Sequence, residues 1–283
     1  MFMSSPEISL PSEIIKPKKK SLELPDGETY DVSTARRTVE GVGRNPALAE
    51  KFKKAALGRA EDIFESGQLK EKIKEGDVVL YIGAGTGYVP QYIEQHTGAK
   101  IIKFDIADLR AADTKDSHYA LANARRLPLR DASINTVCLF DILHHTRNQE
   151  EILKEALRVL KPGGTCLIME DTIPESFQKG SGAKKWLVGK MDDVFNLQPR
   201  GVNPHNYHSI SDWELMLQET GFAVDSNQTK SWHWGVPDFL GADRAKRPEH
   251  TTLSRPFEAT MFEVMKAYDR GQDKEILDKN PQE

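Results

Sequence analysis

Residues 77–87, DVVLYIGAGTG, constrain the fold more than any other part of the chain. Positions 78–82 are β-branched, aromatic and aliphatic residues, which is typical of a buried parallel strand. The run ends in three glycines at alternate positions: Gly83, Gly85 and Gly87. Glycine is needed there because the turn must reach positive φ and the backbone must approach a ligand closely. Residues 88–98 follow with helical spacing, so the segment predicts a strand, a glycine turn and a helix whose N-terminus faces the ligand.

The spacing of the glycines separates two classes of ligand. A dinucleotide fingerprint, GxGxxG, has its third glycine where this chain has Tyr88. The spacing here is GxGxG, which lacks the close diphosphate cradle. Downstream, a second apolar run, KIIKFD, ends in Asp105. An acid at the tip of this strand can accept hydrogen bonds from both hydroxyls of a ribose, and this pairing favours a ligand site over a plain structural turn.

These residues and two further stretches resemble the class I S-adenosylmethionine-dependent methyltransferases. The resemblance is to the small-molecule group, methyltransferase type 11, which contains the quinone-biosynthesis enzymes. The further stretches are ANARRLPLRDASINTVCLFDILHHT and EEILKEALRVLKPGGTCLIMED, and the resemblance covers about residues 75–225. It implies an α/β fold: a doubly wound, mostly parallel, seven-stranded sheet of Rossmann-like type, with helices on both faces and an antiparallel last strand.

The resemblance implies S-adenosyl-L-methionine as the cofactor and assigns residues to it. Asp105 would accept the ribose hydroxyls, Ile106 would supply an apolar face to the adenine, and the amide of Asn123 would lie at the adenine edge. The family usually has an acid two residues before the first glycine, where this chain has Tyr81, whose phenol carries no charge at neutral pH. The predicted cofactor-binding residues are Tyr81, Gly83, Ala84, Gly85, Gly87, Asp105, Ile106, Asn123, Ala124, Phe140 and Asp141.

Histidines follow the strand expected at 134–140, in the stretch LHHT. The carboxyl ends of parallel strands are where ligands bind, and histidine is the side chain most easily used as a base near neutral pH. The alternative is that these histidines only pack in the wall of the cleft. We expect His144 to be a base or positioning group, because a strand tip is more rigid than a loop. We expect Tyr207 and His208 to contact the acceptor. The predicted catalytic residues are His144, His145, Tyr207 and His208.

Composition excludes several other classes. The 283 residues are 38% hydrophobic and 29% charged, with a formal net charge of −4, which is typical of a soluble globular protein and argues against a dedicated nucleic-acid binder. Cys138 and Cys166 fall in expected buried strands and lack the spacing of a metal site, so we predict no metal and a reducing compartment. No apolar stretch reaches the ~20 residues of a membrane span, and the N-terminus lacks a basic head before an apolar core. We expect a cytoplasmic monomer or homodimer.

The pattern along the chain predicts four regions. Residues 1–28 are polar and contain KPKKK, which predicts a flexible tail. Residues 29–75 predict a helical cover over the cofactor cleft, with plain packing as the alternative. Residues 76–234 form the expected S-adenosylmethionine-binding methyltransferase domain, in which 172–208 are an insertion expected to be the acceptor lid. Residues 235–283 predict a C-terminal helical extension, because RPFEATMFEVMKAYD places apolar side chains on one helical stripe.

Local signals also predict the end of the domain. A capping box at residues 211–214 predicts the start of a helix. The last two strands are expected at 222–225 and 229–234, as an antiparallel pair at one edge of the sheet.

The predicted function is in-line methyl transfer to a small-molecule acceptor held over the tips of the strands at 134–140 and 165–171. A sulfonium already activates its methyl group, so alignment supplies most of the catalysis and no obligatory catalytic signature is expected. Two alternatives stay open. One is a binding or regulatory protein that keeps the fold without turnover. The other is a tRNA-modifying methyltransferase whose basic surface comes from a partner.

Overall fold

The computed structural model describes residues 22–23, 29–30, 44–114, 118–175, 206–232 and 258–266. A short antiparallel pair is formed by β1 (Leu22–Glu23) and β2 (Thr29–Tyr30). Most of the predicted tail and residues 176–205 of the predicted lid lie outside the described residues, as do 233–257 and 267–283.

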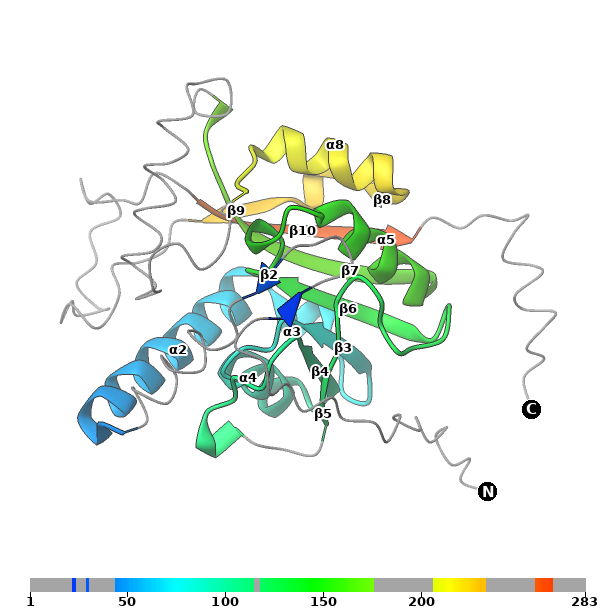
Figure 1. The fold of residues 1–283 in the computed structure, drawn as a ribbon. Coiled ribbons are helices and arrows are strands. Elements are labelled where there is room, and N and C mark those ends of the chain that lie inside the picture. Colours follow the sequence, from blue (N-terminus) through cyan, green and yellow to red (C-terminus); the bar gives the residue numbers. More distant parts are fainter. Residues whose placement is uncertain are drawn as a thin grey trace.

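One mixed sheet organises the domain, and its strands follow the order β5-β4-β3-β6-β7-β10-β8, with β9 paired to β10 (Figure 1). Its first five strands are parallel, whereas β10 is antiparallel to β7, β8 and β9. The predicted mostly parallel sheet with an antiparallel last strand is therefore confirmed. The strands are β3 (Val78–Ile82), β4 (Lys100–Asp105), β5 (Tyr119–Leu121), β6 (Ile134–Phe140), β7 (Leu160–Thr172), β8 (Phe222–Val224), β9 (Lys230–Trp232) and β10 (Glu258–Lys266).

Helices cover both faces of the sheet (Figure 1). One layer contains α2 (Pro46–Ser66), α3 (Leu69–Lys72) and α4 (Tyr88–Thr97). The opposite layer contains α5 (Gln149–Val159) and α8 (Ile210–Thr220). Single 3-10 turns lie at η1 (Ala112–Thr114), η2 (Leu143–His145) and η3 (Ser226–Gln228). The turn η2 directly follows β6, so it places the predicted histidines at the carboxyl edge of the sheet.

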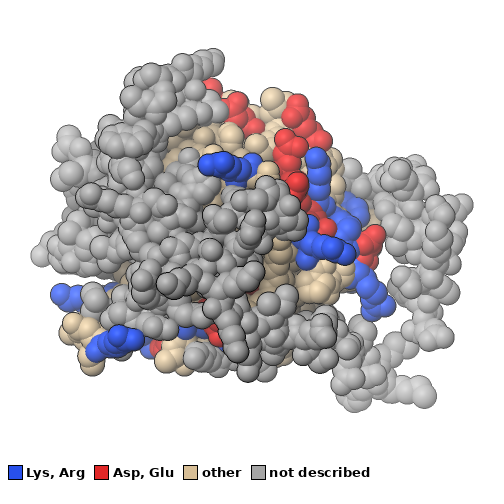
Figure 2. Space-filling model, in the orientation of Figure 1, with Lys and Arg blue, Asp and Glu red and all other residues tan. Residues whose placement is uncertain are grey.

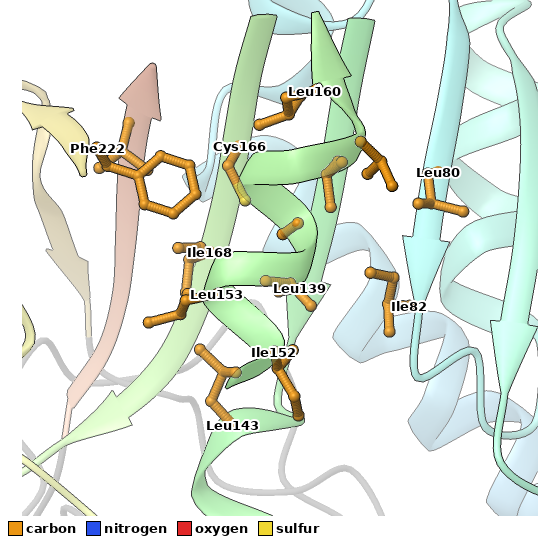
Figure 3. Close-up of a cluster of buried hydrophobic side chains, with 14 of the residues drawn as sticks. Leu80, Ile82, Leu139, Leu143, Ile152, Leu153, Leu160, Cys166, Ile168 and Phe222 are labelled. Atoms are coloured by element: carbon orange, nitrogen blue, oxygen red, sulfur yellow. The ribbon is translucent and has the colours of Figure 1, made fainter. Parts of the chain in front are cut away.

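Two hydrophobic cores, one on each face, hold these layers together. On the α5 and α8 side, Leu153 of α5 packs with Leu139 of β6 and Ile168 of β7 (Figure 3). On the α2 side, Ile63 and Phe64 pack with residues of β3 and α4. Leu153 is fully buried, so its truncation to alanine would cost about 2–5 kcal/mol of folding free energy. The sheet edge that carries the site is thereby held rigid from both sides.

The predicted C-terminal helix is wrong where the structure describes it. Residues 258–266 form β10, which lies between β7 and β8. Thr260, Met261 and Phe262 are buried in succession, because β10 has the sheet on both sides and helices on both faces. The apolar residues in this short segment, Met261, Phe262 and Val264, satisfy helical spacing as well as strand spacing, which explains the error. The expected pairing of 222–225 with 229–234 is also wrong, since β8 and β9 each pair with β10 in the described part of the chain.

Other local predictions can be compared with the structure. The helix α8 begins two residues earlier than predicted, with Ser209 as N-cap accepting a hydrogen bond from the backbone N–H of Asp212. Cys138 and Cys166 are fully buried in β6 and β7, as expected. Among the helices that the structure describes, none is long and apolar enough to span a bilayer.

Candidate functional site

The three glycines after β3 all have positive φ, but their surroundings differ. A Cβ on Gly83 would lie 2.8 Å from Cδ1 of Ile142, and one on Gly87 would lie 2.7 Å from Oγ1 of Thr114. A Cβ on Gly85, whose φ is +51°, would meet no heavy atom of the described residues within 4 Å. Gly83 and Gly87 are therefore required by packing within the protein, whereas Gly85 borders open space.

Asp105, at the end of β4, binds this turn directly. Its Oδ2 accepts a hydrogen bond of 2.7 Å from the backbone N–H of Gly85, and its Oδ1 accepts one of 3.2 Å from Ala107. The side chain is 8% exposed. Burial raises the pKa of this carboxyl to about 6, against the opposing effect of the backbone N–H donors. The predicted ribose acid thus lies beside the open space at Gly85.

The residues predicted for the adenine lie on the same side of the turn. Ile106 follows Asp105 and is half-buried, as are Asn123 and Ala124 after β5. Oδ1 of Asn123 accepts a hydrogen bond of 3.0 Å from the backbone N–H of Arg125, which fixes the orientation of the amide. These residues lie on β4 and β5, the two strands on one side of β3.

On the other side of β3, the tip of β6 carries charge. Asp141 has φ +53° and forms an ion pair with Arg59 of α2. Its Oδ1 is buried and has no hydrogen-bond partner among the described residues. Tyr81 is 3% exposed and packs edge-on against Phe140 at 5.5 Å between ring centroids. Burial raises the pKa of the Tyr81 phenol, so it stays neutral.

Glu170 of β7 fixes the predicted histidine loop. Its carboxylate accepts backbone hydrogen bonds from Ile142, Leu143 and His144, at 3.0, 2.7 and 3.4 Å. It also lies 2.5 Å from Nδ1 of His144. Both side chains are buried, with 3% of His144 and none of Glu170 exposed. Because a carboxylate only accepts, Nδ1 of His144 carries the hydrogen in this contact.

The return of the predicted lid lies against this loop. Tyr207 is buried and stacks on His144 with ring centroids 5.2 Å apart. The ring centroids of His145 and His144 are 4.0 Å apart. His208 is one step further away. Its Nε2 lies 2.7 Å from Oε1 of Gln149, and its ring packs edge-on against Trp213. The structure therefore brings His144, His145 and Tyr207 together, with His208 behind them.

Helix α2 reaches both sides of the glycine turn. Arg59 pairs with Asp141 at β6, and Lys53 lies 2.5 Å from Asp113 of η1. The hydroxyl of Tyr88 donates to the same carboxylate at 2.8 Å. The Lys53 hydrogen bond holds the pKa of Asp113 below its ordinary value. Within the region 29–75, predicted as helical, α2 is a helix attached to the loops on either side of the turn, whereas residues 29–30 form strand β2.

These features fit S-adenosylmethionine. The open space at Gly85 accommodates the close approach of a ligand, and the adjoining Asp105 carboxylate suits a ribose. In the described ranges no group of three or more His, Cys, Asp or Glu side chains could hold a metal ion.

Three side chains of this site were not identified from the sequence. Glu170 is not among the predicted site residues, although an acid at the end of an apolar strand is a usable signal. Gln149 lies inside a helix, where its bonds to the carbonyls of Leu143 and Asn206 depend on the fold. Arg59 is one of many charged residues on α2, and no sequence pattern around it indicates that it pairs with Asp141.

Comparison with known proteins finds a family match over part of the chain. The family described as "Methyltransferase domain" matches residues 80–168. An uncharacterized protein of Methanocaldococcus jannaschii is 26% identical over 189 residues, 62% of this chain and 74% of that protein. A demethylmenaquinone methyltransferase of Tropheryma whipplei is 27% identical over 175 residues, 56% of this chain and 70% of the relative. Fusarielin synthase FSL1 of Gibberella zeae is 28% identical over 167 residues, which are 52% of this chain but only 6% of that synthase.

Solved structures show the same fold at low identity. A putative methyltransferase from Bacillus halodurans has a TM-score of 0.51 and 18% identity, covering 73% of this chain and 99% of its own. The [4+2]-cyclase SpnF has a TM-score of 0.52 and 16% identity, covering 75% of this chain and 81% of its own. Such likeness establishes architecture, and the family match adds the domain type. Residues 80–168 of this chain therefore match a methyltransferase domain, and the fold around them is that of class I, S-adenosylmethionine-dependent methyltransferases.

Proposed function

We propose that this domain transfers the methyl group of S-adenosylmethionine to a small-molecule acceptor held over the tips of β6 and β7. The observation that carries the proposal is the group of packed rings there: His144, His145 and Tyr207. Aromatic rings beside a few fixed polar groups typically line sites for small organic molecules. The names of two relatives, a demethylmenaquinone methyltransferase and a fusarielin synthase, agree with this class of acceptor.

The cofactor supplies an electrophilic methyl group, so the protein has to align the acceptor and accept a proton from it. We assign His144 as the base or positioning group, because Glu170 fixes the orientation of its ring through Nδ1. An acceptor that loses a proton from oxygen or carbon suits such a group. We assign Tyr207 to contact with the acceptor. His208 supports the loop through Gln149.

Surface charge supports a small molecule over a nucleic acid. Figure 2 shows Lys and Arg side chains interspersed with Asp and Glu on the described part of one face. The chain as a whole has a formal net charge of −4. A protein that binds tRNA by itself would be expected to carry a broad basic surface.

The test is methyl transfer from S-adenosylmethionine labelled in the methyl group. The purified full chain is incubated with a panel of phenols, quinols and activated carbon acids and, separately, with bulk tRNA. We expect label in a small organic product and much less with His144→Ala. Label in tRNA alone would contradict the proposed acceptor class. Tight cofactor binding with no transfer to the panel or to tRNA would support the binding-protein alternative.

A further inference from the structure

The ion pair between Arg59 and Asp141 lies at the boundary between α2 and the glycine turn. Asp141 immediately precedes Ile142, whose side chain packs so closely on Gly83 that a Cβ there would lie 2.8 Å away. The ion pair is partly shielded, with 27% of the Arg59 side chain and 20% of the Asp141 side chain exposed. This charge pair is therefore a close neighbour of the turn.

Its position relative to Asp105 indicates which part of the cofactor it meets. Asp105 ends β4 and Asp141 follows β6, and these strands flank β3 on opposite sides. A ribose on Asp105 leaves the rest of the cofactor to extend past the turn. That remainder is the amino-acid end, which carries an α-ammonium and an α-carboxylate. The ammonium needs a negatively charged acceptor, and the carboxylate needs a positively charged donor.

The chain has to supply these charges without Tyr81. The Tyr81 phenol is neutral and 3% exposed, at the position where the resembled family has an acid. Asp141 has the charge that Tyr81 lacks, and its buried Oδ1 has no hydrogen-bond partner among the described residues. A buried carboxylate oxygen in that state is costly unless a ligand donates to it.

We propose that Asp141 and Arg59 together bind the amino-acid end of S-adenosylmethionine, Asp141 accepting from the α-ammonium and Arg59 donating to the α-carboxylate. A guanidinium has five N–H donors in one plane, so it can bind a ligand carboxylate and hold Asp141 at once. The negative charge that is missing at Tyr81 is in this way supplied by Asp141, which follows the neighbouring strand β6. Arg59 of α2 supplies the positive charge. The inference rests on the cofactor assignment and is independent of the acceptor.

The structure offers a control for the alternative that Arg59 only attaches α2 to the domain. Lys53 is on the same helix and forms a comparable ion pair with Asp113, on the other side of the turn. Removing Lys53 weakens the attachment of α2 but leaves Arg59 and Asp141 in place. A role limited to attachment would therefore give Lys53→Ala and Arg59→Ala the same effect.

The experiment compares two ligands by titration calorimetry on the full chain. S-Adenosylhomocysteine has the amino-acid end, whereas 5′-methylthioadenosine has the same nucleoside and a thioether without it. For Arg59→Ala and Asp141→Asn we expect about 10-fold to 100-fold weaker binding of S-adenosylhomocysteine, the usual effect of losing a hydrogen bond to a charged group. Binding of 5′-methylthioadenosine should change by less than about 2-fold. Lys53→Ala should leave the ratio of the two affinities at the parent value.

Asn is chosen at position 141 because it tolerates positive φ, and Arg59→Lys keeps the charge should Arg59→Ala fail to fold. Lysine should restore part of the selectivity for S-adenosylhomocysteine. The proposal is overturned if Arg59→Ala and Asp141→Asn weaken both ligands equally, or if neither variant changes binding of S-adenosylhomocysteine. If the parent binds neither ligand, the cofactor assignment fails and this inference with it. Failure of the proposed acceptor class would leave the affinity ratio unaffected.

Discussion

The cofactor side and the proposed acceptor side of the candidate site are built in different ways. On the cofactor side, backbone N–H groups of the turn at residues 83–87 donate to the Asp105 carboxylate and to the carbonyl of Phe104, both at the end of the adjacent strand β4. On the acceptor side, His144, Glu170 and Tyr207 come from three separate segments and are joined by side chains. The first arrangement follows from the local conformation of glycine and a strand end, whereas the second exists only after the sheet has formed.

This difference predicts how each side responds to substitution. A change in the glycine turn should abolish binding of any ligand with the cofactor's nucleoside. A change at the acceptor side should alter turnover or the Michaelis constant and leave cofactor affinity intact. The following predictions test this separation, in order of decreasing effect.

Gly85→Val should have the largest effect. The side chain would enter the open space beside Asp105, so binding of S-adenosylhomocysteine should weaken by more than about 100-fold. Valine at φ +51° also costs about 1–3 kcal/mol of folding free energy. Gly76→Val is the matched control, because Gly76 has φ +83° and no described atom within 4 Å of its Cβ, but precedes β3 at the far end of the strand. The control should lose similar stability in thermal melts and keep its affinity.

His144→Ala should lower kcat by about 100-fold or more, the lower end expected for loss of a general base. Its affinity for S-adenosylhomocysteine should remain near that of the parent, since the ring contacts Glu170 and Tyr207 and not the turn. His96→Ala is the control, as His96 is exposed on α4. Steady-state kinetics with an identified acceptor measure both. An unchanged kcat in His144→Ala would assign both histidines to packing.

Cofactor affinity should depend on pH through Asp105. Burial places the pKa of this carboxyl at about 6, and only the ionised form accepts two ribose hydrogen bonds. Affinity should therefore be constant above pH 7 and fall as pH decreases through 6, by about 10-fold at pH 5. Asp105→Asn should bind the cofactor more weakly, and its affinity should no longer fall as pH decreases through 6. If the fall in affinity persists in Asp105→Asn, a group other than Asp105 causes the pH dependence.

Tyr207→Phe should have the smallest effect. The ring still stacks on His144, so kcat should stay near that of the parent. Loss of the hydroxyl should raise the acceptor's Michaelis constant by a few-fold, about the effect of one neutral hydrogen bond. Equal losses in kcat and in kcat/KM would instead place the hydroxyl in the transition state.

The same difference explains what the sequence could predict. The strand, turn and acid at 78–105 were recognisable because glycine spacing and apolar runs report local backbone conformation directly. The bonds from Glu170 to the loop after β6 span 26–28 positions, and the Arg59–Asp141 pair spans 82, so no local pattern records them. For β10 the apolar run was visible, but its position between β7 and β8 depends on pairing that the run does not encode.

The most direct test of the account is calorimetric titration of S-adenosylhomocysteine into the parent chain and into Asp105→Ala. The account predicts one site in the parent and binding about 10-fold to 100-fold weaker in the variant, because two ribose hydroxyls lose a charged acceptor. Thermal melts of both proteins verify that the variant is folded. Equal affinity in the two proteins would contradict the assignment of this turn and acid to the cofactor.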